Sequence, residues 1–109
     1  MGRGWIKLHR NMLDWEWYED VSTTRVFIHL LLTANHKDKK WKGETIKRGC
    51  LVTSVRHLAE DTKLSTRTIQ RCLKKLVKTG EIRKRSTNKY TVIEIVNYSK
   101  YQADEDHNR

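Results

Sequence analysis

Apolar residues recur every three or four positions near the start of the chain, which is the spacing of one face of an amphipathic helix. The residues that follow this spacing are Trp5, Leu8, Met12 and Trp15. We therefore expect a short helical segment at the N-terminal end. A polar break from Glu16 to Asp20 follows it and contains Trp17 and Tyr18.

A second, more strongly apolar helix is expected after that break, with Ser22 or Thr23 as the residue that caps its first turn. Its inward side consists of Val26, Phe27, Leu30, Leu31 and Ala34. Because residues 27–32 are apolar around much of the helix circumference, we expect this helix to lie at the centre of the core.

The sequence predicts the secondary structure of residues 35–53 less clearly. Residues 35–43 are charged and end in a glycine, which is typical of a loop. We expect Trp41 within them to fold back onto the body of the protein. Residues 44–53 indicate short extended pieces around a turn at Gly49.

Residues 54–79 predict two short helices joined by a tight turn. Ser54 opens the first helix, and Ser65 is well suited to cap the second. The second helix is expected to end before Gly80, a residue that adopts left-handed conformations without a steric penalty. Two strand-like runs, 81–85 and 90–96, follow it.

The turn between these two strand-like runs contains Asn88, which is suited to a positive φ. Together the elements predict a mainly α-helical chain with a small β-hairpin, which belongs to the α+β class.

The helix over 66–78 has two chemically different faces when it is placed on a helical wheel. Ile69, Leu73 and Leu76 cluster on one side, flanked by Cys72 and Val77. The opposite side carries Arg67, Arg71, Lys74 and Lys78, with Gln70 and Lys75 on its shoulders. One face is therefore expected to pack on the preceding helix while the other displays cations.

Positive charge is concentrated in the same part of the chain. From Lys63 to Lys89 there are ten lysines and arginines against one acid, Glu81, which gives this stretch +9 of the total net charge of +10. Charge concentrated on a compact element is the electrostatic signature of nucleic-acid binding. A solvated, lysine-rich surface without a ligand is the simpler alternative, although such surfaces usually intersperse acids.

In a complex with double-stranded DNA, we expect the polar and basic residues of this region to contact different parts of the duplex. Side chains near the start of a helix that enters the major groove reach the bases, which indicates Thr66, Arg67, Gln70 and Arg71 as base-reading candidates. Residues toward the other end are expected to bind phosphates, and these are Lys74, Lys75 and Lys78. The hairpin adds a basic loop suited to the flanking backbone or minor groove, formed by Arg83, Lys84, Arg85 and Lys89.

The composition limits the other classes of function. A chain of 109 residues with 37% hydrophobic residues is enough for one domain, which we place at 1–102. Residues 103–109 form an acidic tail that we expect to fray. No apolar run long enough to span a membrane and no secretory signal is present, which predicts a protein without a membrane partner.

The sequence shows no pattern typical of a catalytic, disulfide or metal-binding site. Cys50 and Cys72 are isolated, which favours a reducing cytoplasm and two small packing residues over a disulfide or zinc site. The histidines lack the spacing of a metal site, and no phosphate-binding loop or nucleophile motif occurs. We therefore expect that the protein is not an enzyme and that it binds no cofactor.

Several segments together resemble a known family. Residues 49–54, 58–59, 64–69, 73–76 and 79–82 resemble the core of a winged helix-turn-helix, in which 54–62 and 65–79 are the two helices and 81–96 is the wing. The tryptophan-rich start, residues 27–37 and the ending 97–102 narrow the resemblance to the N-terminal domain of phage- and mobile-element-encoded replication proteins of the DnaD-like, replisome-organiser kind.

The resemblance implies a winged helix-turn-helix with an extra N-terminal helical segment, DNA binding through a recognition helix (66–79) and a basic wing (83–89), and a role in initiating phage or mobile-element DNA replication. Family members typically continue into a second domain that contacts other replication proteins. Two alternatives stay open: a transcriptional regulator, and a protein-interaction module that docks an acidic partner. The aromatic residues Trp5, Trp15, Trp17 and Tyr18 can either cover the core or form a homodimer surface.

Overall fold

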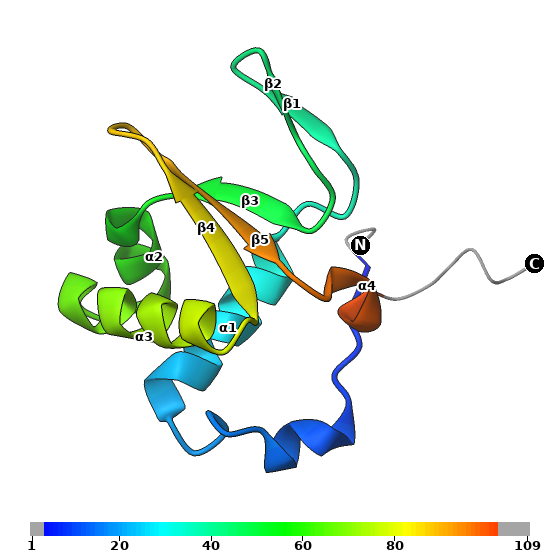
Figure 1. The fold of residues 1–109 in the computed structure, drawn as a ribbon, viewed down its shortest axis with the longest axis vertical. Helices are drawn as coiled ribbons and strands as arrows, with labels where there is room; N and C mark the ends of the chain where they lie inside the picture. Colours follow the sequence, from blue (N-terminus) through cyan, green and yellow to red (C-terminus); the bar gives the residue numbers. More distant parts are fainter. Residues whose placement is uncertain (1–3, 103–109) are drawn as a thin grey trace, which may run out of the picture.

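The helix Val21–Thr33 (α1) lies at the centre of the fold, as its apolar pattern predicts (Figure 1). Val26, Phe27 and Leu30 on it are buried. The predicted cap was wrong, because the side chain of Asp20 accepts a hydrogen bond from the backbone N–H of Thr23 at 3.1 Å and thereby caps the helix. Thr23 itself is buried inside the first turn.

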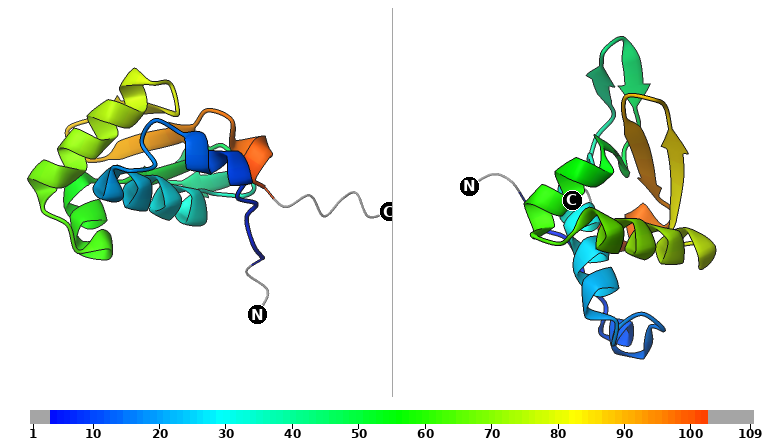
Figure 2. Two further views of the ribbon diagram at one scale, coloured as in Figure 1. Left: turned by 90° about the horizontal axis from the view of Figure 1, so that it is seen from below. Right: turned by 90° about the vertical axis from the view of Figure 1, so that its left-hand side faces the viewer.

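The computed structural model describes residues 4–102 and shows an α+β fold. The other helices in this range are α2 (Val55–Thr62), α3 (Thr66–Lys78), the short α4 (Tyr98–Tyr101) and a 3-10 helix, η1 (Arg10–Asp14). The first three α-helices pack on one another beside the sheets (Figures 1 and 2). The expected tail at 103–109 lies outside the described residues.

Two antiparallel sheets complete the fold. A three-stranded sheet has the order β3-β5-β4, in which β3 is Cys50–Thr53, β4 is Ile82–Ser86 and β5 is Thr91–Ile95. A separate hairpin consists of β1 (Lys39–Trp41) and β2 (Glu44–Ile46). The prediction of a loop over 35–43 was therefore wrong in part, because β1 lies within it.

The residues of the three-stranded sheet alternate between a core face and an outer face. Ile82 pairs with Ile95, and Lys84 pairs with Ile93, so these side chains share the face toward the helices. Arg83 and Arg85 point to the other face. The core of the protein fills the space between the first face and the helices, and its buried members include Leu51, Leu58, Ile69, Leu73, Leu76, Ile82, Ile93 and Ile95.

The N-terminal segment is less helical than its spacing predicts. Ile6 forms an antiparallel bridge with Gln102, and Lys7 N–H donates to the carbonyl of Tyr101 at 2.6 Å. Helical structure is limited to η1, and Leu8 is exposed. Pairing with the end of the chain therefore holds residues before η1 in an extended conformation.

The turn between β4 and β5 also differs from its prediction. Within residues 4–102 the non-glycine residues with positive φ are Lys42 and Lys63, so Asn88 does not adopt the expected conformation. Instead the hydroxyl of Thr87 accepts hydrogen bonds from the N–H groups of Lys89 and Tyr90, both at 3.1 Å. This side-chain-to-backbone bonding closes the turn without a left-handed residue.

The expected contacts at the C-terminal end are confirmed. Tyr98 is buried, and the ring of Tyr101 packs edge-on against Phe27 with 5.7 Å between the centroids. Neither of the two 13-residue helices, nor any other helix in residues 4–102, is long and apolar enough to cross a membrane.

Candidate functional site

Helices α2 and α3 are joined by a three-residue turn whose geometry follows from its sequence. Ser54 caps α2 by accepting from the N–H of His57 at 3.0 Å, and Ser65 caps α3 by accepting from the N–H of Thr68 at 3.1 Å. Lys63 adopts the left-handed conformation, φ 63°, that ends α2. Both predicted caps are confirmed, and together they fix the start of α3 relative to α2.

The two faces of α3 are separated as the helical wheel predicts. Ile69, Cys72, Leu73 and Leu76 are buried. The residues on the opposite face are exposed, and these are Thr66, Arg67, Gln70, Arg71, Lys74 and Lys78. No carboxylate of residues 4–102 forms an ion pair with any of the cations in this exposed set. They therefore remain available for an anion from outside the protein.

Lys75 differs from its neighbours on α3. Its ammonium group lies 2.5 Å from Oδ2 of Asp20 and 5.2 Å from the ring centroid of Trp17, and its side chain is half-buried. It therefore faces the segment that precedes α1. The prediction that Lys75 binds phosphate is not supported by this geometry, because a carboxylate within the protein already neutralises its charge.

The C-terminal end of α3 carries a paired hydrogen-bond motif. Gly80 has φ 82°, its N–H donates to the carbonyl of Val77 at 3.1 Å, and the N–H of Glu81 donates to the carbonyl of Leu76 at 3.0 Å. This is the pattern of a Schellman motif, in which glycine is favoured because it has no Cβ. The predicted end of α3 at Gly80 is thereby confirmed.

The N-terminal tryptophans pack against that end of α3. Trp15 Nε1 donates to Glu81 Oε2 and Trp17 Nε1 donates to Thr79 Oγ1, each at 3.0 Å. Both side chains also contact the core, which confirms the packing interpretation for these two residues. Trp5 is 67% exposed and Tyr18 is 42% exposed, so the homodimer surface stays a prediction for them.

The hairpin β4–β5 presents fewer unpaired cations than its sequence indicates. Arg83 Nη1 lies 3.3 Å from Glu94 Oε1, and Arg85 Nη2 donates to Glu44 Oε2 at 2.6 Å. The hydrogen bond from Arg85 and a second one from Tyr90 hold the pKa of Glu44 below its usual value. Lys84 and Lys89 are exposed, and no ion pair joins them to a carboxylate of residues 4–102.

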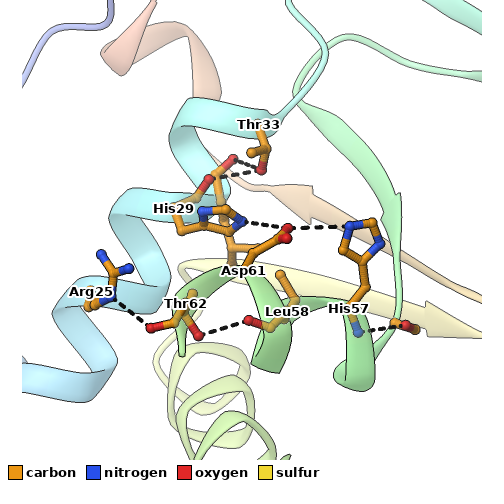
Figure 3. Close-up of polar contacts among 9 residues, drawn as sticks. Arg25, His29, Thr33, His57, Leu58, Asp61 and Thr62 are labelled. Atoms are coloured by element: carbon orange, nitrogen blue, oxygen red, sulfur yellow. Dashed lines mark hydrogen bonds and ion pairs between the residues drawn. The ribbon is translucent and has the colours of Figure 1, made fainter. Parts of the chain in front are cut away.

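A polar cluster joins α1 to α2 (Figure 3). Asp61 Oδ2 lies 3.4 Å from His29 Nε2 and 3.3 Å from His57 Nε2. Arg25 Nε donates to the carbonyl of Thr62 at 3.2 Å, close to the C-terminal end of α2. These contacts hold α2, the helix that precedes α3, against α1.

Sequence reasoning missed the contact to His29, because 32 positions along the chain separate it from Asp61. Only the i, i+4 spacing of His57 and Asp61 on α2 could have indicated part of the cluster.

The two cysteines in residues 4–102 are free thiols. Cys72 is buried. Burial raises the pKa of the half-buried Cys50 thiol, and the charge of Glu94 adds to this effect, so little of the nucleophilic thiolate is present near neutral pH. Within the same residues no group of three histidine, cysteine or acidic side chains is placed to hold a metal ion.

Comparisons with protein-family models, with curated proteins and with solved structures find no match to this chain.

Proposed function

We propose that this protein binds double-stranded DNA and that its fold is a winged helix-turn-helix, in which α2 and α3 are the two helices and β4–β5 is the wing. The observation that carries the proposal is the exposed face of α3, where cations without an intramolecular carboxylate partner in residues 4–102 lie opposite a buried apolar stripe.

The dimensions and chemistry of α3 suit the major groove. Its 13 residues span about 20 Å, and a groove about 12 Å wide admits one helix with its side chains. Arg67 and Arg71 can each donate two hydrogen bonds to guanine, and Gln70 can make the equivalent pair with adenine. Lys74 and Lys78, toward the other end, are placed for phosphates.

We expect the wing to contribute fewer contacts to DNA than its four cations suggest. Arg83 and Arg85 point to the sheet face away from the helices and are paired with Glu94 and Glu44. Lys84 lies on the face that α3 shares, and Lys89 lies in the turn between the strands. We therefore assign only these two lysines to the DNA interface.

A role in initiating the replication of a phage or mobile element is part of the same proposal and rests on the resemblance described above. A transcriptional regulator would use the same helix, because both functions require base recognition. A selection of duplexes from a random pool, followed by locating the selected sites relative to genes, distinguishes these two roles.

Binding of a fluorescent duplex, measured by anisotropy at low and moderate salt, tests the proposal. The wild-type protein should bind, and its affinity should fall by orders of magnitude between about 50 and 200 mM salt if about six phosphates are contacted. The double variant R67A/R71A should lose most of this affinity with an almost unchanged melting temperature, because both side chains are exposed.

The matched control removes the same charge elsewhere. Arg10 in η1 and Lys100 in α4 are exposed and lie on the opposite side of the fold from the start of α3, so R10A/K100A should bind nearly as the wild type does (Figure 1). If the wild type fails to bind duplex DNA, or if R67A/R71A binds as tightly as R10A/K100A, the proposal is wrong. Binding of an acidic protein with unchanged DNA affinity in R67A/R71A would instead favour the protein-interaction alternative.

A further inference from the structure

The hairpin β1–β2 carries a second concentration of positive charge. Residues 37–42 contain four lysines and one acid, Asp38. The Oδ1 atom of Asp38 accepts a hydrogen bond from the backbone N–H of Arg48 at 2.8 Å. All four lysines are exposed, and none forms an ion pair with a carboxylate of residues 4–102. Their charge is therefore uncompensated in the described part of the chain.

The tip of this hairpin is a two-residue turn at Lys42 and Gly43. Trp41 pairs with Glu44, and the two turn residues have φ 49° and 80°. Positive φ at both positions is typical of a type I′ turn, which favours asparagine or aspartate at its first position. A lysine there is conformationally costly, and its ammonium group lies 5.1 Å from the centroid of the Trp41 ring in the same hairpin.

The hairpin is held rigidly against the wing. The rings of Trp41 and Tyr90 meet edge-on with 4.7 Å between their centroids. The two carboxylate oxygens of Glu44 accept from Tyr90 OH at 3.0 Å and from Arg85 at 2.6 Å. Because these contacts already fix the position of the hairpin, a ligand that binds it incurs little additional loss of conformational entropy.

The position of the hairpin brings two of its lysines, Lys39 and Lys40, beside α2. Both hairpins extend away from the helices toward the same side (Figures 1 and 2). Lys39 and Lys40 line a cleft of about 290 Å³ together with His57 of α2. In helix-turn-helix proteins the first helix crosses the DNA backbone. The lysines therefore lie on the side where flanking phosphates would pass.

We propose that the β1–β2 hairpin is a second phosphate-binding arm, in which Lys39, Lys40 and Lys42 contact the sugar–phosphate backbone of the duplex beside the segment bound by α3. This inference rests on the proposed function. It assigns to β1–β2 the backbone contacts that Arg83 and Arg85 do not make, because Glu94 and Glu44 already neutralise those two arginines.

The test compares three forms of the full chain on one duplex over a range of salt concentrations. In K39Q/K40Q/K42Q the hairpin keeps its size and loses its charge. The plot of log affinity against log salt should become less steep by about two to three, because each lost phosphate contact removes about 0.9 from the slope. In K39R/K40R/K42R the charge is retained, so the slope of log affinity against log salt should equal that of the wild type.

The outcomes separate this inference from the proposed function. Suppose that the wild type binds DNA and that R67A/R71A loses affinity, but that K39Q/K40Q/K42Q keeps the wild-type slope and affinity. The proposal of a phosphate-binding arm would then be wrong, while the proposed function would stand. Absence of wild-type binding would overturn both. Because all three lysines are exposed, the far-ultraviolet circular dichroism and melting temperature should match the wild type, which excludes unfolding as the cause of a changed slope.

Discussion

The ammonium group of Lys75 lies 2.5 Å from Oδ2 of Asp20, and this pair joins α3 to the start of α1. The other carboxylate oxygen of Asp20 caps α1 by accepting from Thr23 N–H. Burial alone would raise the pKa of Asp20, but the hydrogen bonds from Lys75 and Thr23, together with the charge of Lys75, lower it overall. One aspartate thus connects two helices and pairs with Lys75, a residue that the sequence analysis assigns to phosphate binding.

The lowered pKa of Asp20 predicts a loss of stability in acid. Because the folded-state pKa lies below the unfolded value of about 3.9, the contribution is fully present above about pH 4 and is lost as the pH falls through the folded-state pKa. An asparagine in place of Asp20 can still cap α1, so D20N should melt below the wild type at pH 7, and the difference should shrink as the pH falls below about 4. A difference in melting temperature that stays constant from pH 7 into acid would contradict the ion pair.

The buried face of α3 predicts a large core effect at Leu73, which is 2% exposed. Leu73→Ala should lower the free energy of unfolding by about 2–5 kcal/mol, because it removes buried apolar atoms and leaves a cavity. Val77→Ala is the matched control on the same helix, since Val77 is 41% exposed, and its cost should stay near about 0.5 kcal/mol. Similar losses for both variants in urea titrations would mean that the helix is rotated from its described orientation.

Two glycines with similar backbone angles should respond differently to alanine. Gly49 has φ 85°, and a Cβ there would lie 2.9 Å from Cβ of Tyr98, whereas Gly43 has φ 80° and nothing within 4 Å. We expect Gly49→Ala to cost about 2–4 kcal/mol from conformational strain and overlap together. Gly43→Ala should cost about 1 kcal/mol from strain alone. Calorimetric melts that rank the two variants in the opposite order would refute the close packing at Tyr98.

The two lysines at the far end of α3 should affect DNA affinity without affecting sequence preference. In K74A/K78A the slope of log affinity against log salt should fall by about 1.8, because phosphate contacts are lost and base contacts are kept. In R67A/R71A the discrimination between selected and unrelated duplexes should shrink as well. A loss of sequence discrimination in K74A/K78A would show that the assignment of roles along α3 is reversed.

The elements with strong local signals could be predicted from the sequence. The boundaries of α3 follow from an apolar stripe with Ser65 before it and Gly80 after it, and both ends are confirmed. The central position of α1 follows from its wide apolar surface, and the burial of Phe27 and Leu30 confirms it. In each case residues close in sequence determine the structure.

Two errors are local: the cap of α1 is Asp20, and the turn after β4 is closed by Thr87 rather than by a left-handed Asn88. The other errors concern features that depend on distant residues. The hairpin β1–β2 has strands of three residues, and its contact between Trp41 and Tyr90 joins positions 49 apart in the chain. The N-terminal segment is extended because Ile6 pairs with Gln102. The partner of Arg85 is Glu44, 41 positions away. Local pattern does not encode such pairings, so the sequence could not show that Arg85 of β4 is paired with a carboxylate of β2.

The bridge between Ile6 and Gln102 brings both ends of the described chain to one corner, on the opposite side of the fold from the start of α3 (Figure 1). A surface tether or fluorescent reporter fused at either end would consequently emerge there and leave Arg67 and Arg71 unobstructed. The same closeness makes the fold a candidate for circular permutation, with a short linker that joins the two ends and new termini opened in an exposed loop.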